Sequence, residues 1–114
     1  MNTRRHCFSC DLKDDYQLIA EYKAYHATGK AWPEITKSIK DAGIIDMQIY
    51  LIGNRMFMIM EVNDTFDPIK KSEMDATNPK VKEWENLMGQ FQQELPWAKV
   101  GEKWVSLEKI FQLV

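Results

Sequence analysis

The sequence predicts an α+β fold of the ferredoxin-like type, a split β-α-β sandwich of the kind found in dimeric α/β barrels. The first observation is the pattern: segments that alternate apolar and polar residues, typical of strands, occur near both ends and as a pair in the middle. The second is the Gly53-Asn54 turn, which joins the central pair as a hairpin. The third is the order of segments, β-α-α-β-β-α-β, within one domain that spans residues 1–114.

The first strand and the first helix are predicted from alternation and from capping residues. Residues 5–12 alternate apolar with polar or thiol side chains, which indicates a strand. Asp14 or Asp15 can cap a helix that runs to about Thr28. Gly29 suits the end of that helix, because glycine readily adopts the left-handed conformation needed there.

A second helix is expected over residues 33–42. Proline is tolerated at the first helical position, where its missing N–H costs nothing, and Gly43 closes the segment. Its buried stripe is predicted to comprise Trp32, Ile35 and Ile39.

The central hairpin is predicted to pair residues 44–51 with residues 55–62. The second strand is apolar on both faces, which favours a central position in the sheet with both sides covered. One face carries three methionines, Met56, Met58 and Met60. Such a stripe suits copper or an adaptable groove, but without interleaved cysteine or histidine we favour core packing.

The last third of the chain is predicted to hold helices and a final strand. Residues 66–76 read as a short helix or an ordered loop. Asn78 and the proline after it mark a helix start, and apolar periodicity continues to Leu95. Residues 109–114 alternate in the manner of a strand.

Composition and charge limit the possible partners and the compartment. The net charge is −2 with no long basic run, which argues against nucleic acid and anionic membranes. No segment approaches the roughly 18 apolar residues of a membrane span, and we expect a cytoplasmic location. Cys7 and Cys10 have the C-x-x-C spacing, but on a strand they point to opposite faces. We therefore interpret them as small core or edge residues rather than as a redox pair or half of a zinc site.

Tyr22 and His26 are the strongest candidates for chemistry. Four residues apart on a helix, they lie on one face, one turn apart. Together they provide aromatic surface, two hydrogen-bonding tips and an imidazole that titrates near neutrality. By itself, His26 on such a helix is more often an ordinary packed or exposed histidine than a catalytic one.

Five motifs occur in a fixed order over nearly the whole chain. They are Tyr22-x-x-x-His26, Trp32-Pro33-Glu34, Ile49-Tyr50-Leu51 before the hairpin, Trp84 with Met88, and Ile110-Phe111-x-Leu113. With this ordered set, the chain resembles the L-rhamnose mutarotase family. The resemblance implies a small dimeric ferredoxin-like isomerase that interconverts the α and β anomers of L-rhamnose without cofactor or metal.

The resemblance also implies site residues. His26 corresponds to the catalytic proton donor and Tyr22 to a sugar-binding tyrosine. The family's tryptophan pair falls on Trp84 and Glu85, and a second sugar-binding tyrosine falls on Met47. These two replacements leave L-fucose or another 6-deoxy sugar open. The full set of expected substrate-binding residues is Tyr22, Met47, Trp84, Glu85, Trp32 and Tyr50.

Ring opening needs a proton donor and a proton acceptor, and the sequence does not identify the acceptor. Tyr22, Asp11, Glu85 or a water molecule are candidates. Two other classes share the fold: small dimeric monooxygenases without added cofactor, and ligand-binding or regulatory modules. We expect a homodimer, because a small aromatic-rich chain with one open sheet face has apolar surface to cover.

Overall fold

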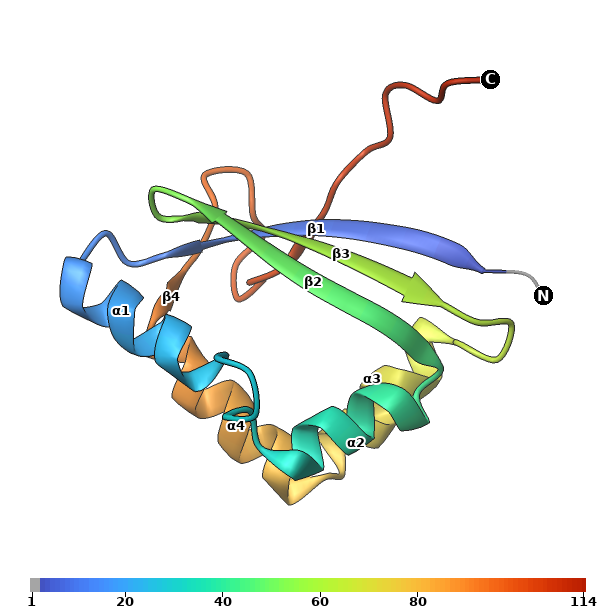
Figure 1. The fold of residues 1–114 in the computed structure, drawn as a ribbon, viewed down its shortest axis with the longest axis horizontal. Helices are drawn as coiled ribbons and strands as arrows, with labels where there is room; N and C mark the ends of the chain where they lie inside the picture. Colours follow the sequence, from blue (N-terminus) through green and yellow to red (C-terminus); the bar gives the residue numbers. More distant parts are fainter. Residues whose placement is uncertain (1–2) are drawn as a thin grey trace.

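The computed structural model describes residues 3–114, which form an antiparallel sheet with helices on one face (Figure 1). The elements in chain order are β1 (Arg4–Leu12), α1 (Tyr16–Tyr25), α2 (Pro33–Asp41), β2 (Ile44–Ile52), β3 (Arg55–Val62), α3 (Pro68–Ala76), α4 (Pro79–Gly89), β4 (Gln92–Gln93) and β5 (Val105–Ser106). In this described part, no helix is long and apolar enough to cross a membrane.

The strand order is β2-β3-β1-β4, and β5 also pairs with β1. β1 lies antiparallel to β3, from Arg4 opposite Val62 to Asp11 opposite Arg55. β2 and β3 form the predicted hairpin around Gly53, whose φ of 57° lies in the left-handed region. This arrangement confirms the α+β prediction and the central position of β3.

The core lies between the sheet and the helices. The inward faces of β1 and β3 bury Cys10, Leu12, Met56, Met60 and Val62. Against them pack the buried ring of Tyr22 in α1, Met88 in α4, and Phe91 and Phe66 in the connections. The interpretation of Met56 and Met60 as core residues is therefore confirmed.

Three of the helices begin where capping chemistry predicts. Asp15 accepts hydrogen bonds from the backbone N–H groups of Gln17 and Leu18. Asn78 caps α4, and Asp67 caps α3, in the same way. These caps satisfy N–H groups that have no partner inside the helix.

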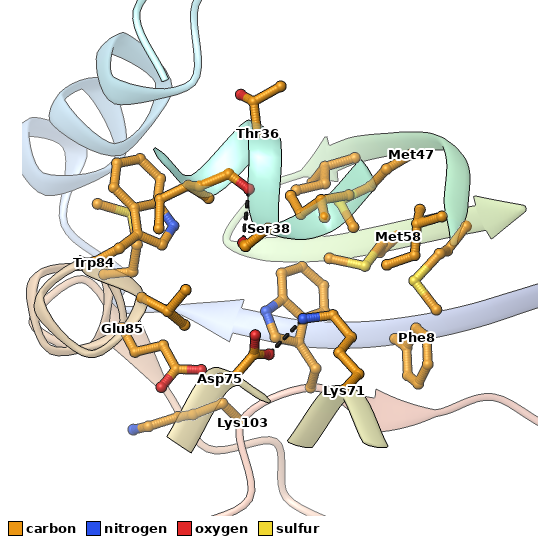
Figure 2. Close-up of a pocket in the computed structure, with 18 of the residues that line it drawn as sticks. Phe8, Thr36, Ser38, Met47, Met58, Lys71, Asp75, Trp84, Glu85 and Lys103 are labelled. Carbon is orange, nitrogen blue, oxygen red and sulfur yellow. Dashed lines mark hydrogen bonds and ion pairs between the residues drawn. The ribbon is translucent and has the colours of Figure 1, made fainter. Parts of the chain in front are cut away.

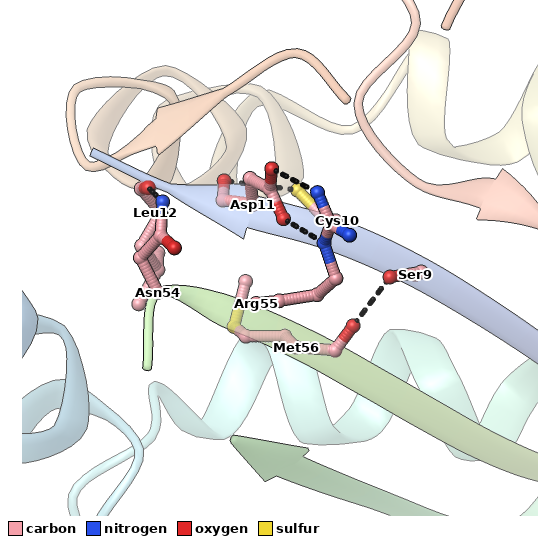
Figure 3. Close-up of polar contacts among 7 residues, drawn as sticks. All are labelled: Ser9, Cys10, Asp11, Leu12, Asn54, Arg55 and Met56. Atoms are coloured by element: carbon pink, nitrogen blue, oxygen red, sulfur yellow. Dashed lines mark hydrogen bonds and ion pairs between the residues drawn. The ribbon is translucent and has the colours of Figure 1, made fainter. Parts of the chain in front are cut away.

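A polar cluster fixes the register at one end of β1 and β3 (Figure 3). Arg55 donates two hydrogen bonds to the carboxylate of Asp11, at 2.8 and 3.1 Å. The Ser9 hydroxyl donates to the carbonyl of Met56 at 2.8 Å, and the Asn54 amide donates to a β1 carbonyl at 2.9 Å. The Asp11 side chain is 5% exposed, so its charge depends on this ion pair.

Two sequence-based expectations about where helices end were wrong. α1 ends at Tyr25 rather than near Thr28. α4 ends at Gly89, and the chain then forms the short strand β4, whose Gln92 pairs with Leu12. The apolar period that extended to residue 95 therefore spans a helix, a strand and a loop.

The expectation of a last strand at residues 109–114 was also wrong. The strand that joins β1 is β5, and residues 107–114 are exposed without regular structure, running away from the sheet in Figure 1. β4 and β5 already occupy the available edge of β1. The tail therefore finds no free edge beside β1, the strand that its preceding segment joins.

The expectation that both faces of β3 are covered is met on one side only. Phe57 points to the face opposite the helices and is 37% exposed. On the same face of β2, Tyr50 and Ile52 are 55% and 71% exposed. The sheet therefore leaves an apolar face open within one chain.

Candidate active site

A cavity of about 1270 Å³ lies between the helix-facing side of the sheet and the helices. Figure 2 shows Phe8, Met47 and Met58 on its sheet side and Trp84 on its helix side. The volume exceeds the range of about 300–1,000 Å³ typical of small-molecule sites. The cavity is therefore large enough to hold a monosaccharide.

Tyr22 and His26 lie together on this cavity, as their spacing predicts. Their rings stack with centroids 4.3 Å apart and an interplanar angle of 25°. His26 is the C-cap of α1, and its Nδ1 lies 2.8 Å from the backbone carbonyl of Tyr22. A carbonyl oxygen only accepts hydrogen bonds, so Nδ1 carries a hydrogen and Nε2 is left to exchange protons.

Partial or full removal from water changes the ionisation of both side chains: Tyr22 is buried, whereas His26 keeps part of its surface exposed to solvent. Desolvation lowers the pKa of His26 from its usual 6.5, and the hydrogen bond to the Tyr22 carbonyl opposes this only in part. Desolvation raises the pKa of Tyr22 to about 12, against a hydrogen bond from Gln92. Near neutrality the imidazole is therefore mainly uncharged and the phenol keeps its proton.

An aromatic wall continues from His26 onto two further helices. The ring of Trp84 in α4 meets His26 edge-on, with centroids 5.4 Å apart. Trp32, the N-cap of α2, meets Trp84 at 5.1 Å and 65°. Trp32 contacts Trp84 but does not itself line the cavity. Such a wall suits the apolar face of a sugar ring.

Charged side chains occupy another part of the cavity. Lys71 and Asp75 form an ion pair one turn apart on α3, and both are largely buried. Glu85 from α4 and Lys103 from the loop before β5 lie close by in Figure 2. Of these only Glu85 was expected, since the spacing of Lys71 and Asp75 does not reveal which way α3 faces.

The remaining expected residues divide between the two faces of the sheet. Met47 is half-buried and lines the cavity. Tyr50 does not: it lies on the open face, where its hydroxyl donates to Gln48 at 3.0 Å. Asp11 is on that face too, paired with Arg55, so it is not the proton acceptor of this cavity. Sequence reasoning missed Gln92, a buried polar residue of β4 that lines the cavity.

Comparisons with known proteins identify the family of the chain. A family model described as L-rhamnose mutarotase matches residues 5–113. The L-fucose mutarotase of Xanthomonas campestris pv. campestris is 41% identical over 113 residues, which cover 99% of this chain and 90% of that protein. The L-rhamnose mutarotase of Flavobacterium johnsoniae is 27% identical over 114 residues, covering 98% of this chain and 97% of that protein.

Solved structures share the fold. A crystal structure of an L-rhamnose mutarotase from Formosa agariphila superposes with a TM-score of 0.70 at 24% identity, covering 97% of this chain and 99% of the other. A polyketide cyclase from Streptomyces glaucescens superposes with a TM-score of 0.59 at 14% identity, over the same shares. At these identities the two structures establish only the fold. The match of the family model over residues 5–113 establishes the family. The chain therefore belongs to the L-rhamnose mutarotase family and is an isomerase that acts on carbohydrates.

Proposed function

We propose that this protein interconverts the α and β anomers of a 6-deoxy hexose, with L-fucose and L-rhamnose as the two candidate sugars. The observation that carries the proposal is the stacked pair of Tyr22 and His26 on a cavity with a tryptophan wall. Mutarotation requires only proton transfer at the anomeric hydroxyl and the ring oxygen. An imidazole with one free nitrogen and a protonated phenol supply both kinds of group.

His26 is the catalytic residue of this proposal. Its Nε2 is free, while Nδ1 is fixed by the Tyr22 carbonyl, so the ring has a defined orientation. Because the anomers interconvert in both directions, the group that gives a proton in one direction receives it in the other. The proton-donor role implied by the family resemblance is thus one half of the cycle.

Trp84 and Met47 are proposed to bind the sugar from opposite sides of the cavity. The Trp84 ring offers a flat apolar surface to the C–H face of the sugar. Met47, from β2, suits the 6-methyl group that distinguishes a deoxy sugar from glucose. Glu85 accepts hydrogen bonds from sugar hydroxyls where a second tryptophan would give stacking surface.

The proposed preference between the two sugars is based on the identity of the chain to its relatives. Among the relatives above, the L-fucose mutarotase has the higher identity, at 41% against 27%. We expect exchange on both sugars, faster on L-fucose. Saturation-transfer NMR measures the exchange between anomeric protons directly, and a panel of L-fucose, L-rhamnose and D-glucose tests the assignment. D-glucose as the best substrate, or no exchange above the uncatalysed rate, would refute it.

A homodimer in the cytoplasm completes the proposal. The open face of the sheet exposes Tyr50, Ile52 and Phe57, and the tail exposes Ile110 and Phe111 at 89% and 74%. Apolar surface of this extent favours burial against a second copy. Sedimentation at micromolar protein should give twice the mass of one chain, and a monomer throughout would contradict it. Cell fractionation tests the compartment.

A further inference from the structure

Gln92 makes a single hydrogen bond that links the short strand β4 to the site helix α1. Its side-chain Nε2 donates to the hydroxyl oxygen of Tyr22 at 3.2 Å. Gln92 is 7% exposed and Tyr22 is 4% exposed, and both line the cavity that holds His26. Because both side chains are buried within the site, the direction of this bond bears on the proton chemistry there.

The direction of this bond determines what the Tyr22 hydroxyl can do. A phenol has one hydrogen to donate and an oxygen that accepts. Since the amide N–H of Gln92 donates to that oxygen, the hydrogen of Tyr22 is not used by Gln92. It is available to an acceptor in the cavity.

The bond at His26 has the complementary effect. The Nδ1–H of His26 donates to the carbonyl of Tyr22, which leaves Nε2 as an acceptor in the neutral ring. Tyr22 and His26 are stacked with ring centroids 4.3 Å apart. One helical turn therefore presents a hydrogen donor and a hydrogen acceptor side by side.

We propose that Gln92 is a positioning residue that turns the Tyr22 hydroxyl hydrogen toward the sugar, so that Tyr22 is the acid at the ring oxygen and His26 the base at the anomeric hydroxyl. This assignment rests on the mutarotase function proposed above and adds to it the direction of each proton. Gln92 acts through Tyr22 and does not itself exchange a proton.

The ring-opening step balances with these two groups alone. His26 Nε2 takes the proton of the anomeric hydroxyl, and the electrons of that O–H bond form the second bond of the C1 carbonyl. The C1 bond to the ring oxygen breaks, and its electron pair takes the proton of the Tyr22 hydroxyl. C1 rotates; on closure the phenolate recovers its proton, and the imidazolium returns its proton to the carbonyl oxygen on the other face.

The experiment compares two substitutions that change the bond in opposite ways. In Gln92→Glu, a carboxylate can only accept, so it draws the Tyr22 hydrogen away from the sugar. In Gln92→Met, the bond is lost but the hydrogen stays free, in a side chain of similar length. Exchange is measured from about pH 7 to about pH 9.5, a range that extends above the pKa of about 8–9 reached by buried glutamates. The uncatalysed rate is subtracted at each pH, and circular dichroism confirms folding.

We expect Gln92→Glu to lower the maximal exchange rate at least about tenfold, which is part of the about 10²–10⁴-fold that a whole acid–base group contributes. Gln92→Met should lose clearly less, and KM should change little in both variants. A purely structural role gives the opposite order, because Gln92→Glu keeps a hydrogen bond between β4 and α1 and Gln92→Met removes it. Equal losses, or a larger loss in Gln92→Met, would overturn the proposal.

A second arm repeats both substitutions in a Tyr22→Phe background. If Gln92→Glu does not fold, the comparison of Gln92→Met with and without the Tyr22 hydroxyl still tests the positioning role. With the hydroxyl gone, each change at Gln92 should alter the exchange rate by less than about twofold. An undiminished effect would overturn the positioning role. Absence of exchange in the unmodified protein would instead refute the mutarotase function, so the two failures are distinguishable.

Discussion

Replacing His26 by alanine should slow anomer exchange at least about 100-fold and leave the chain folded. Acid–base groups contribute about 10²–10⁴-fold, and 100-fold corresponds to about 2.7 kcal/mol of activation free energy. The fold loses the Nδ1 hydrogen bond and the contact with Tyr22. These are worth about 1 kcal/mol and about 0.5–1.5 kcal/mol, against a typical total of about 5–15 kcal/mol.

The assay is saturation-transfer NMR on L-fucose and L-rhamnose, with circular dichroism on each variant. Glu21→Ala is the matched control, because Glu21 lies on the exposed side of the same helix. Tyr22→Phe removes the proposed acid but keeps the stacked ring, so it should also slow exchange, by less than His26→Ala. A folded His26→Ala protein with near-normal exchange on both sugars would refute the role of the imidazole.

The pH dependence follows from the lowered pKa of His26. Only the neutral ring accepts a proton, so exchange should rise with pH through a value below the usual 6.5 and then stay level. The unfolded chain binds this proton more readily, so the group's contribution to stability falls as pH drops below 6.5. Exchange rates and melting temperatures between about pH 4 and 8 test both statements. A midpoint above 6.5 would contradict the role of desolvation.

Two further predictions concern the register cluster and the sugar contacts. Arg55→Ala leaves the buried carboxylate of Asp11 without its partner and should lower the melting temperature by roughly 4 °C or more. Arg5→Ala, at an exposed ion pair, should change it by much less, and equal effects would contradict the importance of burial. Glu85→Trp and Met47→Tyr should each shift the ratio of L-rhamnose to L-fucose exchange by at least about threefold toward L-rhamnose. An unchanged ratio in both would remove these positions from the specificity argument.

Much of the fold could be predicted because local chemistry and long-range pairing agree. Asp15 and Asn78 cap helices where residue type indicates, and Gly53 turns the hairpin. Alternation in β1 and β3 correctly divides the core side from the open side. The prediction of a strand at residues 109–114 failed for a physical reason. Alternation indicates that a segment suits an extended, half-buried state, but it does not identify the neighbouring strand.

The site was predictable where it depends on a single helix and not where it depends on tertiary packing. Tyr22 and His26 meet because four residues make about one helical turn, and this spacing is visible in the sequence. Gln92 reaches Tyr22 across 70 residues of chain, from a two-residue strand without a recognisable pattern. Tyr50 was misplaced because sequence spacing alone does not say which face of β2 meets the helices.

The spacing of four in the Tyr22-to-His26 motif has three consequences at once. It places the imidazole over the phenol ring, so the two groups share one wall of the cavity. It brings Nδ1 to the carbonyl four residues back, one of the carbonyls that the end of α1 leaves without a helical partner. That hydrogen bond fixes which nitrogen is free. A spacing of three or five would lose the carbonyl contact, and with it the defined tautomer, even if the two rings still touched. In the proposed mechanism the end of the helix is therefore part of the chemistry. The Tyr22 carbonyl holds His26, the C-cap of α1, and the same bond leaves Nε2 as the nitrogen that would exchange the proton.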